Sequence, residues 1–336
     1  MVLIIILFLV SVLVIAIAGT KLSKVADQLA DITGLGEAIF GAIFLGSVTS
    51  LPGIITSVVS AYEGFPRLAM SNAIGGVAAQ TLFLSIADIS YPKINLEHAA
   101  ASFANLMQGV LLVVLFAFVL VGMSGPELTF WHIHPFSFLL LMFYILGMRL
   151  ISRAKDYPMW NPKETKETVQ DVPDDKNIKH LNKKKVIAKF LFLALMVSAA
   201  GFTVAKTGIQ IAERTGLSES FVGSMLTAVA TSLPELIVSL ASIRQRALTL
   251  AVSNIIGGNS FDVLFVAFSD FAYLDGSIYH AVTNEQLFTI ALTMLMTGIL
   301  LLGLLHREKR GIAQIGWESF LVILFYILGN AYLFFM

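Results

Sequence analysis

Long apolar stretches recur along the chain and constrain its fold more than any other feature. An α-helix needs about 20 mostly apolar residues to cross the roughly 30 Å core of a bilayer. Stretches of that kind, separated by polar or turn-forming residues, lie at 2–19, 37–62, 67–90, 100–123, 136–152, 187–208, 219–242, 248–270, 286–305 and 312–335. They predict an all-α integral membrane protein with ten transmembrane helices. The composition, 57% hydrophobic and 13% charged, excludes a soluble globule.

The first stretch has one competing interpretation. Ala16-Ile17-Ala18 resembles a signal-peptidase site after an apolar run. However, no Lys or Arg precedes the run, and its length suits a full crossing better than a short signal core. We therefore expect residues 2–19 to form the first transmembrane helix.

One long polar segment divides the ten stretches into five and five. Residues 153–186 contain three prolines and many charged side chains, a composition typical of a linker without a core of its own. The predicted domains are a first five-helix unit at 1–152, this linker, and a second five-helix unit at 187–336.

The basic residues predict the orientation in the membrane. If the N-terminus lies outside, only Arg67, Lys206 and Arg214 lie outside, and all others of the 22 basic residues fall in cytoplasmic loops or the linker. Cytoplasmic loops carry such an excess of Lys and Arg. The sequence thus predicts a multi-pass cell-membrane protein with residues 153–186 in the cytoplasm. The zero net charge gives no indication of a nucleic-acid partner.

The two halves contain an internal repeat. Residues 30–88 align with 212–270 without a gap, with about 22 identities in 59 positions. The shared blocks include Thr-Ser-Leu-Pro, at 49–52 and 231–234, and Ser-Asn-x-Ile-Gly-Gly, at 71–76 and 253–258. Because five crossings separate the two copies, the second enters the membrane from the opposite side. Inverted repeats of this kind are common in secondary transporters, which bind substrate where the halves meet.

Each Thr-Ser-Leu-Pro block lies within an apolar stretch, where proline removes a backbone donor and should break the helix. A broken helix leaves carbonyl oxygens free, and hydroxyl oxygens lie beside them. The hydroxyls belong to Thr49, Ser50, Thr231 and Ser232. Such oxygens suit a dehydrated hard cation. A single proline kink would favour a purely structural role, but two kinks at matching positions favour an ion site.

Two carboxylates stand out within the apolar stretches. Glu235 follows the second Thr-Ser-Leu-Pro block, and Asp262 lies in the middle of its stretch. No Lys or Arg within either stretch compensates them, and an unpaired charge at the membrane centre costs about 2.5–3.5 kcal/mol. Protonated, purely structural acids are the alternative, but intramembrane carboxylates without partners indicate a cation site.

These motifs resemble those of the calcium:cation antiporter superfamily, whose best-known members are the sodium/calcium exchangers. Its members carry a Gly-Thr-Ser-x-Pro-Glu block and a Gly-Ser-Asn-x-x-Asn/Asp block in each repeat. The resemblance implies one central ion site and broken helices. Side-chain ligands would come from Thr49, Ser50, Gln80, Thr231, Ser232, Glu235, Asn259 and Asp262, and backbone carbonyls from Gly46 and Ala228. Glu235 and Asp262 would bind the metal ion directly. The resemblance implies exchange of calcium for sodium or protons by alternating access, without a resident cofactor.

The first copy departs from the family pattern. Gly53 stands where the family has a glutamate, and Gln80 stands where it has Asn or Asp. Only two negative charges remain, enough for one divalent ion or two monovalent ions. We therefore expect nearly electroneutral exchange. A second hypothesis is that Gly53 opens space for a different cation or a larger solute.

Other kinds of chemistry find little support in the sequence. The chain has no cysteine, no His-Glu-x-x-His motif and no Walker loop, which argues against thiol chemistry, a zinc protease and ATP-driven pumping. We expect a transporter and not an enzyme. A channel on the same scaffold and a degenerate homologue without transport activity are the alternatives.

Overall fold

The computed structural model describes residues 1–33, 44, 46–91, 94–100, 102–156, 158–163, 182–309, 311 and 316–336. Within these residues the regular structure is helical, and an isolated bridge between Phe130 and Ile133 is the one strand-like pairing. Eight helices are long and apolar enough to cross a membrane, and a bent pair of shorter helices makes a ninth span. The chain is therefore a multi-pass, all-α membrane protein, and the count of ten remains a prediction.

The helices of the first half occupy residues up to Asp156. They are α1 (Val2–Val14), the π-helical turn η1 (Ile15–Gly19), α2 (Thr20–Thr33), α4 (Leu51–Tyr62), α5 (Pro66–Ile89), α6 (Leu96–Ala100), α7 (Phe103–Ser124) and α8 (Pro135–Asp156). The second half contains α9 (Lys183–Thr215), α10 (Glu219–Phe221), η3 (Val222–Thr227), α11 (Ala228–Thr231), α12 (Leu233–Arg244), α13 (Leu248–Asp262), α14 (Phe265–Ala272), α15 (Asn284–His306) and α16 (Trp317–Phe335).

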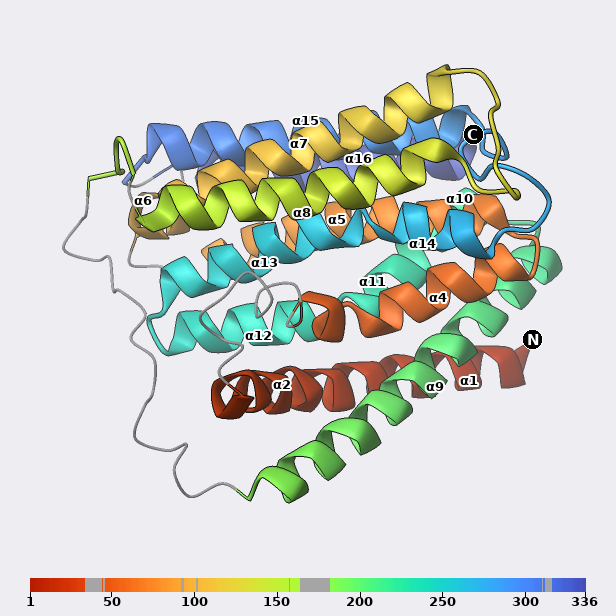
Figure 1. Ribbon diagram of the computed structural model, residues 1–336, viewed down its shortest axis with the longest axis horizontal. Coiled ribbons are helices and arrows are strands. Elements are labelled where there is room, and N and C mark those ends of the chain that lie inside the picture. Colours follow the sequence, from red (N-terminus) through yellow and green to blue (C-terminus); the bar gives the residue numbers. More distant parts are fainter. Residues whose placement is uncertain are drawn as a thin grey trace.

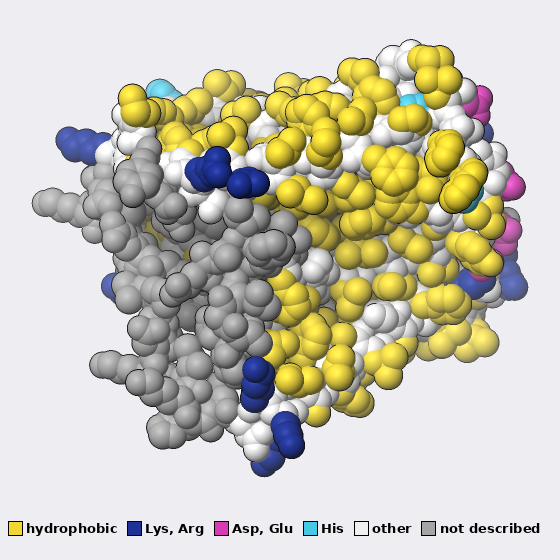
Figure 2. All heavy atoms as spheres, in the orientation of Figure 1, with side chains coloured by type: hydrophobic (Ala, Val, Ile, Leu, Met, Phe, Trp, Pro, Cys, Tyr) yellow, Lys and Arg dark blue, Asp and Glu magenta, His cyan; other side chains and the backbone are white. Residues whose placement is uncertain are grey.

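Both chain ends lie at one end of the helical bundle, whereas α8 ends and α9 begins at the opposite end (Figure 1). Each half therefore crosses the bundle an odd number of times. Hydrophobic side chains cover the middle of the face seen in Figure 2, and the coloured charged side chains gather toward its two ends. This distribution fits a bilayer whose normal runs along the bundle.

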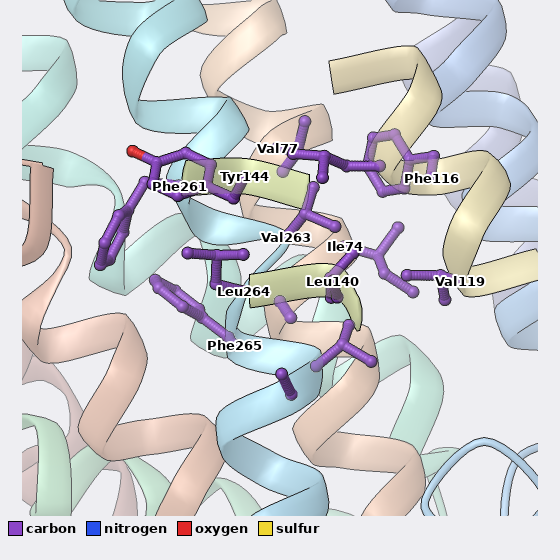
Figure 3. Packing of buried hydrophobic residues seen from close by; sticks show 14 of the residues in the cluster. Ile74, Val77, Phe116, Val119, Leu140, Tyr144, Phe261, Val263, Leu264 and Phe265 are labelled. Carbon is purple, nitrogen blue, oxygen red and sulfur yellow. The ribbon is translucent and has the colours of Figure 1, made fainter. Parts of the chain in front are cut away.

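Helix α5 forms the centre of the bundle, because nearly all of its residues are buried. Its many alanines and glycines allow other backbones to approach closely. A Cβ atom on Gly75 would lie 2.5 Å from Cα of Ser224 in η3. Small residues at such contacts are the usual way for membrane helices to pack. The largest apolar cluster continues from α5 through α7, α8, α13 and α14 (Figure 3).

Both predicted proline breaks fall at the serine of the repeated block. Ser232 separates α11 from α12, and the axes on its two sides differ by 45°. Ser50 precedes α4 with nearly the same backbone angles, φ −82° and ψ 3°, against φ −94° and ψ 4° for Ser232. Proline occupies the first turn of α4 and α12, where its missing N–H costs no helical hydrogen bond. The break is confirmed in both copies.

Other boundaries differ from the apolar stretches. The first helix continues through η1 to Thr33, and α9 extends from Lys183 to Thr215, because helices project beyond the apolar layer into polar surroundings. The early part of the predicted stretch 37–62 lies largely outside the described residues, as does most of the predicted linker. An unpredicted interruption separates α13 from α14 immediately after Asp262.

Candidate functional site

A small cavity lies where the two broken helices meet α5, α13 and α14. Its volume is about 10 Å³, close to the space that holds one water molecule. Its lining residues are Ser50, Gly53, Asn72, Gly76, Gln80, Thr231, Ser232, Glu235, Asp262 and Phe265. The cavity thus collects both predicted carboxylates and four of the predicted polar ligands from both copies of the repeat. None of its lining residues is basic.

Asp262 accepts hydrogen bonds at both of its carboxylate oxygens. Its side chain is 2% exposed and ends helix α13. Ser50 Oγ donates a hydrogen bond to Oδ1 at 2.5 Å, and Gln80 Nε2 donates to Oδ2. The amide of Gln80 also reaches Ser232 Oγ at 3.4 Å. The break before α4 and helix α5 therefore both donate to this carboxylate, and Gln80 links it to the break before α12.

Glu235 stands on the first turn of α12 and lines the same cavity. Its side chain is 3% exposed, and Oε2 has no hydrogen-bond partner among the described residues. A buried carboxylate oxygen without a partner loses its hydration and gains nothing in return. Beside Asp262, this oxygen favours a cation or a proton as its ligand.

The contacts of the cavity recur with the same offset as the sequence repeat. Adding 182 to the numbers of Ser50 and Gln80 gives Ser232 and Asp262. The pairs Ser50–Asp262 and Gln80–Ser232 are therefore one contact, made once by each copy. The same offset relates Asn72–Ser57 to Asn254–Ser239, and the close approach of Gly201 to Pro52 to that of Gly19 to Pro234.

Several predicted ligands do not line the cavity. The hydroxyl of Thr49 donates to the carbonyl of Gly46, and the amide of Asn259 donates to Thr81 Oγ1 at 3.1 Å. The carbonyl of Ala228 accepts from both Thr231 and Ser232. Their roles as ligands stay predictions. Asn259 Oδ1 is buried and has no hydrogen-bond partner among the described residues.

Gly53 does not create an open space. A Cβ atom at this position would lie 2.6 Å from Cε2 of Phe265, whose ring fills the volume beside the backbone. Figure 3 shows the rings of Phe261 and Phe265 extending on the same side of the apolar cluster. The hypothesis that Gly53 makes room for a larger solute is therefore wrong for this conformation. The ring of Phe265 therefore lines the site beside position 53, where the family pattern has a glutamate.

Asn72 is a residue of the cavity that the motif comparison did not nominate. Its amide donates to Ser57 Oγ at 2.8 Å and to the Gly53 carbonyl at 3.3 Å, and its Oδ1 accepts from Thr227 at 2.7 Å. It thereby joins α4, α5 and η3. Its place in the repeated Ser-Asn block was the available signal, but the block alone does not say which of its polar residues faces the cavity.

A second matched pair of buried acids also escaped prediction. Asp88 accepts hydrogen bonds from the Leu96 amide at 2.7 Å and from Ser319 Oγ at 3.0 Å. Its counterpart Asp270 accepts from the Ile278 amide at 3.0 Å and from Ser137 Oγ at 2.6 Å. These carboxylates anchor the chain just beyond α5 and α14, at opposite ends of the bundle (Figure 1), and their partners are also 182 residues apart.

Comparisons with known proteins place the chain in a family. Residues 3–152 and 185–335 match the family described as sodium/calcium exchanger protein. The chain belongs to this family. Its members are secondary transporters, so the chain is a cation transporter by family. The predicted resemblance is confirmed.

Individual similarities extend over nearly the whole chain. An uncharacterized membrane protein of Methanocaldococcus jannaschii is 26% identical over 310 residues, which cover 91% of this chain and 90% of that protein. The crystal structure of the H⁺/Ca²⁺ exchanger CAX has a TM-score of 0.70 and 14% identity, with 99% of this chain and 86% of that chain covered. The sodium-calcium exchanger NCX_Mj has a TM-score of 0.62 and 20% identity, with 98% and 99% covered. At these identities the structures establish the fold alone.

Within the described residues, no group of three or more His, Asp or Glu side chains is arranged to hold a metal ion. The cavity instead offers two carboxylates with hydroxyl and amide oxygens. Hard cations take such oxygen ligands. The donor set suits a transported ion that binds and leaves better than one held permanently.

Proposed function

We propose that this protein is a secondary active cation antiporter that exchanges one divalent cation, Ca²⁺, for Na⁺ or H⁺ by alternating access. The observation that carries the proposal is the meeting of Glu235 and Asp262 in one buried cavity without a basic partner among its lining residues. Each carboxylate would be costly without a cation or a proton. Both stand next to a break in their own helix. We propose that a small rotation at these breaks changes access to either side.

The number of charges in the site determines the expected stoichiometry. Two carboxylates neutralise one divalent ion, two sodium ions or two protons. The first copy contributes Gly53 and Gln80 in place of acidic side chains, so it adds no charge. Exchange of one Ca²⁺ for two monovalent cations moves no net charge, and we expect it to be insensitive to membrane voltage.

The architecture that goes with this function is an inverted repeat of two five-helix units. The matched contacts at an offset of 182 residues, and the odd number of crossings in each half, support this arrangement. We further propose that the protein resides in the cell membrane with its N-terminus outside and the linker in the cytoplasm, since this orientation puts most basic residues inside. Lipid then surrounds the bundle as its permanent environment.

The proposal is tested with purified protein in liposomes. An outward Na⁺ or H⁺ gradient should drive ⁴⁵Ca²⁺ uptake, and Glu235→Gln and Asp262→Asn should each abolish it. Glu63→Gln is a matched control, because Glu63 follows the last residue of α4, lies outside the cavity and pairs with Lys206 on a half-exposed surface. Uptake that proceeds equally without any counter-ion gradient would indicate a channel and contradict exchange.

One observation favours a second candidate, a homologue that binds ions without transporting them. The Gln80 amide donates a hydrogen bond to the Asp262 carboxylate and so occupies an oxygen that a cation would bind. Phe265 closes the side of the cavity next to Gly53. If the site stays closed in this way, ⁴⁵Ca²⁺ uptake is absent even though equilibrium binding of Ca²⁺ still depends on Glu235. Binding and flux measured on the same preparation separate the two functions.

A further inference from the structure

A second and larger cavity lies at the end of the bundle where α8 ends and α9 begins. It has a volume of about 380 Å³, within the range of ligand sites. Its lining residues are Ser90, Tyr91, Leu240, Ile243, Arg244 and Arg246. The first two follow helix α5, and the others belong to the end of α12 and the turn after it. Two arginines therefore face a cavity with an apolar wall on one side.

No acidic side chain among the described residues balances either arginine. Among the described residues, Arg244 and Arg246 make no ion pair and no side-chain hydrogen bond. Both side chains are exposed. A guanidinium group offers a planar fork of donors that matches phosphate oxygens. The chemistry of the cavity is thus that of a site for a phosphate group with an apolar neighbour.

The backbone at Arg246 provides an independent observation. The turn after α12 closes with hydrogen bonds from the Arg246 amide to Ile243 and from the Ala247 amide to Ser242. In this turn Arg246 adopts φ 64°, the left-handed conformation that side chains disfavour and that glycine adopts readily. The same turn in the first copy has Gly64 at the equivalent position, with φ 82°. The second copy therefore keeps a strained arginine where its own duplicate has the unstrained residue.

Two simpler roles explain a basic residue at the end of α12, but they do not explain why Arg246 occupies a left-handed backbone position. Basic residues at a helix end offset the helix dipole, and basic residues on one side set the membrane orientation. Arg244, in the last turn of α12, can serve both purposes without strain. Neither purpose requires a second arginine in the left-handed position. A ligand that both side chains bind together provides the missing reason.

We propose that this cavity binds a phosphate-bearing anion, held by Arg244 and Arg246 beside Tyr91. The group can be the headgroup of an acidic phospholipid or a free phosphate, since both present the same oxygens. Basic pockets between membrane helices bind acidic headgroups in this way. The bound group bridges the ends of α5 and α12, which carry Gln80 and Glu235 further along. The inference concerns a different site and does not rest on ion exchange.

Binding is measured on the full chain in a neutral detergent by native mass spectrometry, with phosphatidylglycerol, phosphatidylcholine and inorganic phosphate as separate probes. We expect saturable binding of phosphatidylglycerol or of phosphate, and none of phosphatidylcholine. Arg244→Gln and Arg246→Gln should each weaken it about fivefold, the effect of one basic residue at a membrane surface. Arg153→Gln, which removes an exposed arginine from the same end of the bundle, is the matched control.

Arg246→Gly distinguishes a ligand site from a structural role. It removes the side chain and installs the residue that the first copy uses, so we expect the ligand-free melting temperature to stay equal or rise while anion binding falls. Competition between the probes identifies the source. Phosphate that displaces the lipid indicates a site for the free anion, and lipid that resists displacement indicates a headgroup site. Failure of both probes to bind, or equal loss in Arg153→Gln, would overturn the proposal.

Discussion

The contact between Gly53 and Phe265 makes a sharp prediction about the site. A methyl group at position 53 would lie 2.6 Å from Cε2 and 3.3 Å from Cζ of the ring. Carbon atoms pack at about 3.5–4.0 Å, so the ring must move by roughly 1 Å. Phe265 is 3% exposed and has little room to move. Overpacking of this kind costs about 1–3 kcal/mol.

A second glycine of the same cavity provides the matched control. A methyl group on Gly76 would lie 3.6 Å from Ser232 Oγ and 3.8 Å from Asp262 Oδ2, which are ordinary contacts. Both glycines are helical, so the gain in helix propensity on changing to alanine is about the same in both and cancels in the comparison. We expect Gly53→Ala to be less stable than Gly76→Ala by about 1–3 kcal/mol.

The assay is the melting temperature of the detergent-purified protein, followed by size-exclusion chromatography after heating. One kcal/mol shifts the melting temperature by about 2–4 °C in chains of 150–250 residues, so the two variants should differ by at least about 2 °C. In a Phe265→Leu background the difference should largely disappear. The reasoning fails if Gly53→Ala is as stable as Gly76→Ala, or if Phe265→Leu does not reduce the difference.

Three further predictions follow from other contacts. Burial beside the carboxyls of Asp88 and Glu318 raises the pKa of Glu97 well above its usual range, so the stability that its protonated form contributes is lost as pH rises through that pKa. Glu97→Gln should therefore melt at a higher temperature than the parent at about pH 8 and at the same temperature at about pH 5. A difference in melting temperature that does not depend on pH would contradict this cause. Asn72→Ala breaks three buried hydrogen bonds and should lower the free energy of unfolding by about 1–3 kcal/mol. Asn254→Ala breaks one partly exposed hydrogen bond and should lower it less. Equal melting temperatures of the two variants would refute this ranking. Gly53→Glu in the Phe265→Leu background adds a third carboxylate, so transport should begin to carry current under voltage clamp, and flux that remains electroneutral would count against the charge argument.

The sequence predicted the features that follow from periodicity and from proline chemistry. Apolar stretches of spanning length identified a membrane protein, and the repeated prolines indicated both helix breaks, which the structure places at the serine two residues earlier. Glu235 and Asp262 were found because an uncompensated acid in an apolar stretch has few explanations. Each of these signals is local, since it depends on a residue and its immediate neighbours in the chain.

What could not be predicted depends on contacts between distant segments. Glycine at position 53, where the family has glutamate, suggested an empty volume beside the backbone. Phe265, from the other half of the chain, fills that volume. Asn259 follows the family pattern, yet its amide donates to Thr81 and the residue does not line the cavity. No single-sequence argument determines which neighbour takes up a vacated space or a spare hydrogen bond, because packing decides it.

The two copies of the repeat show how a duplicated site becomes asymmetric without losing its geometry. The contact that Ser50 makes with Asp262 is the contact that Ser232 makes with Gln80, so the backbone arrangement is retained although one partner is a carboxylate and the other an amide. An amide can donate to the opposite carboxylate, whereas a second carboxylate would repel it. The change from acid to amide therefore removes a charge and at the same time supplies an internal partner for the charge that remains. A site with this arrangement can close without an ion. If Asp262 binds the transported ion, as we propose, that ion must compete with Gln80 for the carboxylate.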